Sequence, residues 1–270
     1  MAKVLLDDRL WVVLAPLLPP PKPRRKRYPG RKPLDHRQVL TGILFVLKTG
    51  IPWERLPWEM GCGSGMSCWR RLRDWQQAGV WARIHRALLT RLQHADRIDW
   101  SRALVDSSSV RAHHAGKKTG PNPTDRRKLG SKHHLLTDAH GIPLAVLLTA
   151  ANRHDVTQLL PLVEAIPLVQ GRRGRPRQRP DALQGDRGYD SDPHRHALRA
   201  YGLTPVLARR RTAHGSGLGV CRWVVERTIA WLHQFRRLRV RDERRDDIHE
   251  AFLQLGCALI CWNVLGSSFC

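Results

Sequence analysis

Apolar residues recur at helical spacing through the first third of the chain. Residues 35–47 carry valine, isoleucine and leucine on one helical face, and a glycine and a proline then break the pattern. A second helix begins at Ser64 or Ser67, either of which can cap it, and runs to about Trp75, and a third begins at Val80. The pattern therefore predicts an all-helical part over residues 1–97.

The predicted helix that ends near Trp75 has a strongly basic side. Arg70, Arg71 and Arg73 project away from its apolar face. Short helices joined by a tight turn, one of them with an arginine face, are typical of helix-turn-helix-like DNA-binding units. A small helical bundle whose basic face is merely solvated fits the same pattern, so both interpretations stay open at this point.

After residue 97 the pattern changes to short apolar runs that alternate with helical segments. Strands are predicted at 102–106, 132–137, 143–150, 182–186 and 205–208, and helices at 155–166, 192–201 and 220–238. The turn signal Asp138-Ala139-His140-Gly141 joins two of the strands into a hairpin. This order predicts an α/β domain over residues 98–270, with a mixed sheet and helices packed on it.

The charge of the chain identifies the kind of partner. Lys and Arg number 47 and Asp and Glu 23 among 270 residues, which gives a formal net charge of +24. The excess is spread over both predicted parts rather than confined to a tail. An extended polyanion that touches both parts fits this distribution best, and double-stranded DNA is such a partner. The alternative is a basic protein whose charge serves only solubility.

Several segments bear on the compartment. The longest apolar candidate for a membrane span, residues 255–265, is far shorter than a span requires, so we expect no membrane association. Acidic and basic residues interrupt the apolar stretch at the N-terminus, which argues against a signal peptide. The six cysteines form no Cys-x-x-Cys pair, and Cys257 and Cys261 read as buried thiols. We therefore expect a reducing, cytoplasmic location.

Basic residues also gather in the predicted loops. Residues 19–33 are rich in proline, lysine and arginine and predict an extended basic arm or a plain linker. Lys117 and Lys118 lie in a loop after the first strand, and Arg209 and Arg210 follow the last strand. These residues are candidates for contact with the DNA backbone, although mobile, solvated loops would have the same composition.

Three carboxylates stand out against this basic background. Asp106 and Asp186 each end an apolar run, and Glu226 lies in the last predicted helix. Functional side chains gather at strand ends in open α/β sheets, so the two aspartates are expected to meet if their strands are neighbours. Carboxylates without a nearby Cys or His pair suit hard ions such as Mg²⁺ or Mn²⁺. Two such ions would support the cleavage and transfer of phosphodiesters.

The last predicted helix carries two further candidates. Arg222 lies one turn before Glu226, and His233 lies two turns after it on the same stripe. Arg222 is placed to contact a phosphate beside the metal ions. The alternative is an ordinary salt bridge within the helix, which stabilises it by a few tenths of a kcal/mol. The paired histidines of the chain lack the ligand spacing of a zinc site.

These residues fall in strings that resemble the catalytic region of DDE transposases from small bacterial insertion sequences, of the insertion-sequence group four/five type. The resemblance covers residues 101–262, and residues 5–95 resemble the helical N-terminal region of the same group through Gly50-Ile51-Pro52-Trp53 and Trp69-Arg70-Arg71-Leu72. The catalytic strings are Val105-Asp106-Ser107-Ser108, Gly130-Ser131-Lys132-His133-His134-Leu135, Leu148-Thr149-Ala150-Ala151-Asn152-Arg153-His154-Asp155, Gly185-Asp186-Arg187-Gly188-Tyr189-Asp190 and Arg222-Trp223-Val224-Val225-Glu226-Arg227-Thr228.

The resemblance implies an RNase H-like domain with a catalytic, metal-binding triad of Asp106, Asp186 and Glu226. It also implies dependence on Mg²⁺, with Mn²⁺ as a substitute, and cleavage at the ends of an element followed by transfer of a 3′-OH into target DNA. Arg222, Lys132 and the basic loops would neutralise phosphates. We expect a homodimer on DNA, because joining requires two ends together, and a place near the bacterial nucleoid.

The chain departs from the family pattern at two positions of the last helix. Gly219 stands where the family has tyrosine, and His233 stands where it has lysine. The triad is intact, but the grip of this helix on the DNA end is altered, and a protonated His233 would donate to a phosphate more strongly. Two alternatives remain open from the sequence: a metal-dependent nuclease without strand transfer, and an inactive DNA-binding regulator.

Overall fold

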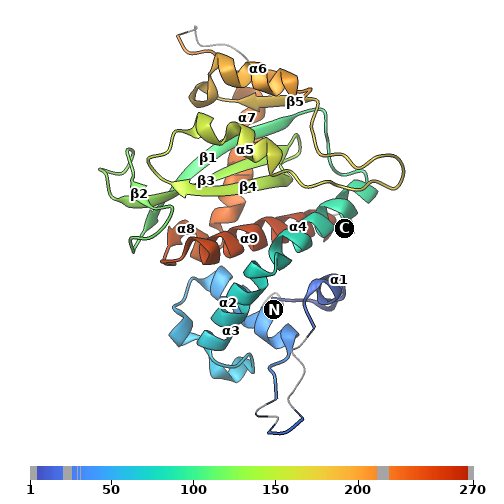
Figure 1. The fold of residues 1–270 in the computed structure, drawn as a ribbon, viewed down its shortest axis with the longest axis vertical. Helices are drawn as coiled ribbons and strands as arrows, with labels where there is room; N and C mark the ends of the chain where they lie inside the picture. Colours follow the sequence, from blue (N-terminus) through green and yellow to red (C-terminus); the bar gives the residue numbers. More distant parts are fainter. Residues whose placement is uncertain (1–4, 21–25, 29, 31, 212–218, 267–270) are drawn as a thin grey trace.

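The computed structural model describes residues 5–20, 26–28, 30, 32–211 and 219–266 (Figure 1). Much of the predicted arm at 19–33 lies outside these residues. The N-terminal part is helical, as predicted, and its elements are α1 (Asp8–Leu14), η1 (Ala15–Leu17), α2 (His36–Thr49), η2 (Trp53–Arg55), η3 (Trp58–Met60), α3 (Gly65–Gln77) and α4 (Val80–His94).

Local signals set the ends of these helices. The carboxylate of Asp35 accepts hydrogen bonds from the backbone N–H groups of Arg37 and Gln38 and so caps α2. Ser64, one of the two predicted caps, accepts from the Ser67 N–H at the start of α3. Gly79 adopts a left-handed φ of 66° between α3 and α4, which allows the tight turn that the helix-turn-helix-like pattern predicted.

A seven-stranded mixed sheet forms the C-terminal part. Its strands are β1 (Ala103–Ala112), β2 (Gly120–Pro121), β3 (Leu129–Asp138), β4 (Pro143–Ala150), β5 (Ala182–Gly185), β6 (Thr204–Leu207) and β7 (Val240–Arg241). The chain runs antiparallel through β1, β3 and β4, and then adds β5 and β6 parallel to β1. This mixed order confirms the RNase H-like fold class.

One strand is longer than the sequence indicated. The run Ser107-Ser108-Ser109 was expected to end the first strand at Asp106, and this expectation is wrong. β1 pairs with β3 residue by residue from Ala103 to Arg111. The polar serines stay in the strand because β3 supplies hydrogen-bond partners for their backbone N–H and C=O groups. Asp106 therefore lies inside β1.

Helices cover the sheet and complete the domain. They are η4 (Asp155–Gln158), α5 (Leu159–Glu164), η5 (Arg187–Tyr189), α6 (Asp192–Ala200), α7 (Gly219–His233), α8 (Arg236–Arg239) and α9 (Asp246–Gly266). The predicted helix at 155–166 begins as a 3-10 turn, and the one at 220–238 is divided into α7 and α8. Residues of β1 and β3 alternate between two faces, with α7 against one face and η4 against the other.

The helical part and the sheet share a single hydrophobic core. α9 packs against α3, α4, α7 and β4, so it lies between the two parts (Figure 1). Within the described residues, α9 is the one helix long and apolar enough to cross a membrane by length and composition, and 67% of its apolar window is buried inside the protein. That burial is the pattern of a core helix, and it fixes the N-terminal helices relative to the sheet.

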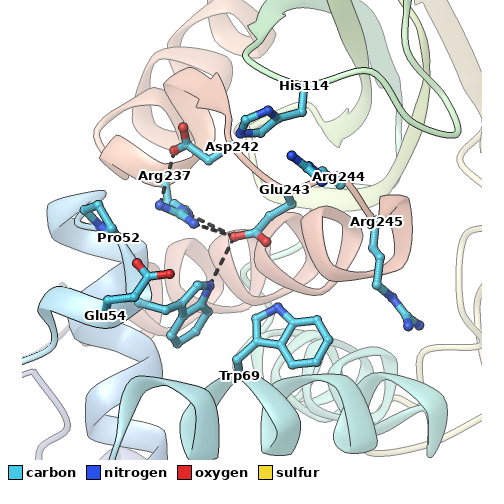
Figure 2. Close-up of a pocket in the computed structure, with 10 residues that line it drawn as sticks. Pro52, Glu54, Trp69, His114, Arg237, Asp242, Glu243, Arg244 and Arg245 are labelled. Atoms are coloured by element: carbon cyan, nitrogen blue, oxygen red, sulfur yellow. Dashed lines mark hydrogen bonds and ion pairs between the residues drawn. The ribbon is translucent and has the colours of Figure 1, made fainter.

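A buried polar contact reinforces this connection. The carboxylate of Glu243 accepts hydrogen bonds from the Arg237 guanidinium at 2.7 and 3.0 Å and from the Trp53 indole N–H at 3.3 Å. Arg237 also donates to the carbonyls of Gly50 and Ile51, so the Gly-Ile-Pro-Trp string binds to α8 and, through Glu243, to the segment that follows it. Figure 2 shows the Arg237 guanidinium directed toward the Glu243 carboxylate. The contact joins the helical part to the part that contains the sheet.

Replacing Glu243 tests this contact. In Glu243→Ala the buried Arg237 keeps only Asp242 as an acidic partner, at 3.2 Å, and Trp53 loses its acceptor. We expect a loss of about 3 kcal/mol in the free energy of unfolding, measured by urea denaturation. Glu54→Ala is the matched control, because Glu54 follows Trp53 directly but is exposed to solvent, so its removal should change stability little. Equal stability of the two variants would contradict the role of Glu243.

Candidate active site

The pairing of two parallel strands places Asp106 and Asp186 side by side. β1 pairs with β5 so that Ala103 faces Leu183 and Leu104 faces Gln184, an offset of 80 residues. The same offset separates Asp106 from Asp186, which follows β5 in extended conformation. Residues in register on neighbouring parallel strands point to the same face. The two carboxylates therefore leave the sheet together, although only Asp186 lies at a strand end.

Each aspartate is held by one oxygen and presents the other. The Oδ1 atom of Asp106 accepts from the Ser107 N–H at 2.8 Å, and the Oδ1 atom of Asp186 accepts from the Gly188 N–H at 2.8 Å. The Oδ2 atoms of both residues face a guanidinium nitrogen of Arg222 on α7. Short backbone bonds thus orient the free oxygens toward one point.

Glu226 reaches the same point from α7. The Nη2 atom of Arg222 lies 3.7 Å from Asp106 Oδ2, 3.9 Å from Asp186 Oδ2 and 3.3 Å from Glu226 Oε1. The salt bridge between Arg222 and Glu226 within α7 is therefore present, and the same guanidinium nitrogen also pairs with both aspartates. The structure brings together all three predicted catalytic residues and the predicted Arg222.

Like charges and burial act on this cluster. Burial raises the pKa of Asp106 to about 6, while the Ser107 N–H and the Arg222 guanidinium lower it and the nearby Asp186 and Glu226 raise it. A cation that comes close to a carboxylate in such surroundings stabilises its charged form. Within the described residues, no group of three Asp, Glu, His or Cys side chains lies close enough together to hold a metal ion as the side chains stand. In the triad, Arg222 stands at the shared centre, and the hard oxygen ligands suit a divalent ion.

The family assignment follows from comparison with known proteins. Residues 101–263 match the family model described as "Transposase DDE domain", and residues 6–85 match "Putative transposase of IS4/5 family". The first match alone covers more than half of the chain. The chain belongs to the DDE transposase family. The resemblance that the sequence indicated is confirmed, and the enzyme depends on divalent metal as this domain implies.

Individual relatives agree with the family. The "Putative transposase for insertion sequence element IS402" of Burkholderia cepacia is 69% identical over 148 residues, which are 55% of this chain and 70% of that protein. The "Transposase for insertion sequence element IS1106" of Neisseria meningitidis serogroup B is 31% identical over 117 residues, 40% of this chain and 37% of that protein. The pre-cleavage Mos1 transpososome aligns over 87% of this chain and 80% of its own, with 12% identity and a TM-score of 0.28, too low to add to the assignment.

Asp155 ends one of the strings that resemble the transposase family, but the sequence pattern indicated no role for it. Asp155 lies on the opposite face of the sheet from α7 and accepts from the Ser107 hydroxyl at 2.8 Å and from the Lys132 ammonium at 2.9 Å. Asp155 therefore holds Ser107, the strand residue next to Asp106, from the face of the sheet opposite α7. An acid directly after an apolar strand and a turn was the signal that could have identified it.

Tyr189 is a second residue for which the sequence pattern indicated no role. Its side chain is fully buried beside Asp106, Asp155 and Asp186, and its hydroxyl lies close to the side chain of Ser107. Burial first, and then these three carboxylates, raise the pKa of Tyr189 well above its usual range. Tyr189 thus offers a neutral O–H donor next to the acidic cluster of the transposase.

The predicted DNA-contacting lysines occupy different environments. The Lys132 side chain is only 12% exposed and is bound to Asp155, so it lies on the face opposite the triad helix. Lys118 pairs with Glu250 at the start of α9, and Lys117 is exposed. Whether these lysines contact DNA stays a prediction, with Lys117 as the one exposed to solvent.

The predicted arginines lie on two surfaces. Arg210 donates to the Arg187 carbonyl at 3.0 Å, so the end of β6 reaches the edge that carries Asp186, and the neighbouring Arg209 lies 3.8 Å from Asp192. The second surface is the outer side of α3, where Arg70 is exposed and Arg71 and Arg73 lie over tryptophan rings. α4 buries its apolar side but also exposes Arg83, Arg86 and Arg91, so the basic surface of the helical part is not confined to α3.

His233 does not join the triad. Its ring lies 6.2 Å from that of His133, whose Nε2 is 2.8 Å from Nε2 of His249 in the interior. Burial, and then the charge of Arg239, lower the pKa of His233. The neutral ring is therefore favoured, and the contact of a protonated His233 with a phosphate stays a prediction that these surroundings do not favour.

The Asp155 contact is open to a direct test. Asp155→Asn leaves the shielded Lys132 ammonium without a carboxylate and weakens the acceptor for Ser107, so we expect a loss of about 1–3 kcal/mol in the free energy of unfolding. Asp181→Asn removes an equally short but exposed pair with Arg177 and should change stability little. Urea denaturation measures both. If Asp181→Asn lowers the free energy of unfolding as much as Asp155→Asn does, Asp155 has no special structural role.

Proposed function

We propose that this transposase cuts DNA at the ends of its element and joins the freed 3′-OH to target DNA through Asp106, Asp186 and Glu226. The single observation that supports this most strongly is the meeting of the three carboxylates at one nitrogen of Arg222. Side chains from β1, the end of β5 and α7 come together there, although they are far apart in the sequence.

We infer that the triad holds two Mg²⁺ ions, with Mn²⁺ as a substitute. Two bound ions would supply stabilisation for both the attacking and the leaving oxygen of a phosphodiester. Asp106 and Asp186 would contribute the Oδ2 atoms that already face a common centre, and Glu226 would complete the ligand set. Their backbone-bound Oδ1 atoms would keep both aspartates oriented.

The two steps use the same residues. Water attacks the phosphodiester at the element end, the bond to the 3′ oxygen breaks, and a free 3′-OH results. That hydroxyl then attacks the phosphorus of a target phosphodiester, forms a new ester bond and displaces the target strand's own 3′ oxygen, without a covalent intermediate on the protein. Arg222 would neutralise phosphate charge at this point, and Arg210 would lie along the same edge.

The basic surface residues indicate how the protein would bind DNA outside the triad. The exposed Arg70 and the half-buried Arg71 and Arg73 of α3, with Lys117 and Arg209, would bind the DNA backbone, so affinity should fall steeply with salt. Two element ends must meet for joining, so we propose a homodimer on DNA. We further propose a cytoplasmic, nucleoid-associated location.

A cleavage assay on element-end DNA with Mg²⁺ tests the proposal. Asp186→Asn keeps the size of the side chain but loses its charge, so we expect cleavage and joining to fall by on the order of 100-fold or more. Asp192→Asn, in the exposed first turn of α6, is the matched control and should retain activity. Cleavage without joined product would favour a nuclease, and equal activity of Asp186→Asn and wild type would remove the mechanism.

A further inference from the structure

We propose that Arg222 competes with metal for the carboxylate triad and that a DNA phosphate releases it, so that the enzyme loads metal readily only when DNA is bound. This inference rests on the proposed function of the triad. It adds a role for Arg222 that precedes any chemistry, because the residue would control when the metal site is open.

The first support is the position of the guanidinium. A single nitrogen, Nη2, lies 3.3 to 3.9 Å from one oxygen of each acid. The oxygens that face it are the same ones that would hold a cation, since the Oδ1 atoms of both aspartates are already bound to backbone N–H groups. Arg222 therefore occupies the place of the positive charge that the triad attracts.

The second support is that Arg222 is held loosely. Only its contact with Glu226 is short enough for a hydrogen bond, and the contacts with Asp106 and Asp186 are longer ion pairs. Its Nε–H is buried without a hydrogen-bond partner in the described part of the chain. The guanidinium thus makes none of the parallel two-bond pairs that hold arginine firmly. One third of the side chain is exposed, so a path to solvent exists.

The third support is the balance of charge. Three carboxylates and one guanidinium leave a deficit of positive charge, which a divalent ion can remove. Once such an ion is present, Arg222 and the ion repel each other at short range, and the arginine needs a new anionic partner. A DNA phosphate is that partner, and it can accept two parallel hydrogen bonds from the guanidinium.

Coupling of this kind is reciprocal. If DNA draws Arg222 away from the triad, it raises the affinity for metal, and metal must raise the affinity for DNA by the same factor. A residue that only positions the carboxylates would behave differently, because its removal would loosen the triad and weaken metal binding. The two roles therefore predict opposite signs for one substitution.

Calorimetric titration with Ca²⁺, which binds carboxylates without requiring turnover, measures the sign. In the absence of DNA we expect Arg222→Gln to bind Ca²⁺ more tightly than wild type by about 5- to 150-fold, the usual range of such couplings. With a short mixed-sequence duplex present, wild type should gain affinity and Arg222→Gln should gain much less. Arg91→Gln, which removes an exposed arginine on α4, is the matched control and should behave as wild type. Circular dichroism confirms that each variant is folded.

The outcomes separate the two proposals. If Arg222→Gln binds Ca²⁺ no more tightly than wild type while Asp186→Asn abolishes binding, Arg222 is not a competitor, and the metal site of the proposed function survives. If Asp186→Asn leaves Ca²⁺ binding intact in both backgrounds, the triad is not the metal site, and both proposals fail. Arg222→Lys adds a further check, because its retained charge should keep Ca²⁺ affinity low without DNA.

Discussion

Three negative charges must be held together before any metal or DNA is present, and this electrostatic demand shapes the structure around them. Asp106 and Asp186 are aligned by the register between β1 and β5, and each gives one oxygen to a backbone N–H. Burial, and then repulsion from Asp186 and Glu226, raise the pKa of Asp106, and Arg222 supplies a positive charge that stabilises the three carboxylates. Without that cation, folding would oppose the geometry that catalysis requires.

The sheet can hold this cluster because both of its faces are supported. On one face α7 brings Arg222 and Glu226 over the aspartates. On the other face Asp155 binds Ser107 and Lys132 and so anchors the strand directly beside Asp106. Farther away, α9 and the Glu243 contact fix the basic helices relative to the sheet. A long DNA molecule could then meet both parts of the chain in a set geometry.

The sequence predicted most of the elements and the proximity of the three carboxylates, because both leave local signals. Periodicity located α2, α3 and α4, and acids after apolar runs identified Asp106 and Asp186. Hairpin pairing extended β1 past the point where the polar serines indicated an end. The surroundings of side chains depend on residues distant in the sequence, so they were not predictable. Lys132 turned out to be bound to Asp155, His233 faces His133, and the Arg222 salt bridge includes both aspartates as well as Glu226.

The most direct test of the central claim is a crystal structure with Mn²⁺, whose anomalous scattering locates the ion without ambiguity. We expect an anomalous peak between the Oδ2 atoms of Asp106 and Asp186 and the carboxylate of Glu226, with the guanidinium of Arg222 moved out of the centre that it occupies here. Mn²⁺ bound at another place, with Arg222 still between the three carboxylates, would contradict the view that this cluster is the catalytic metal site.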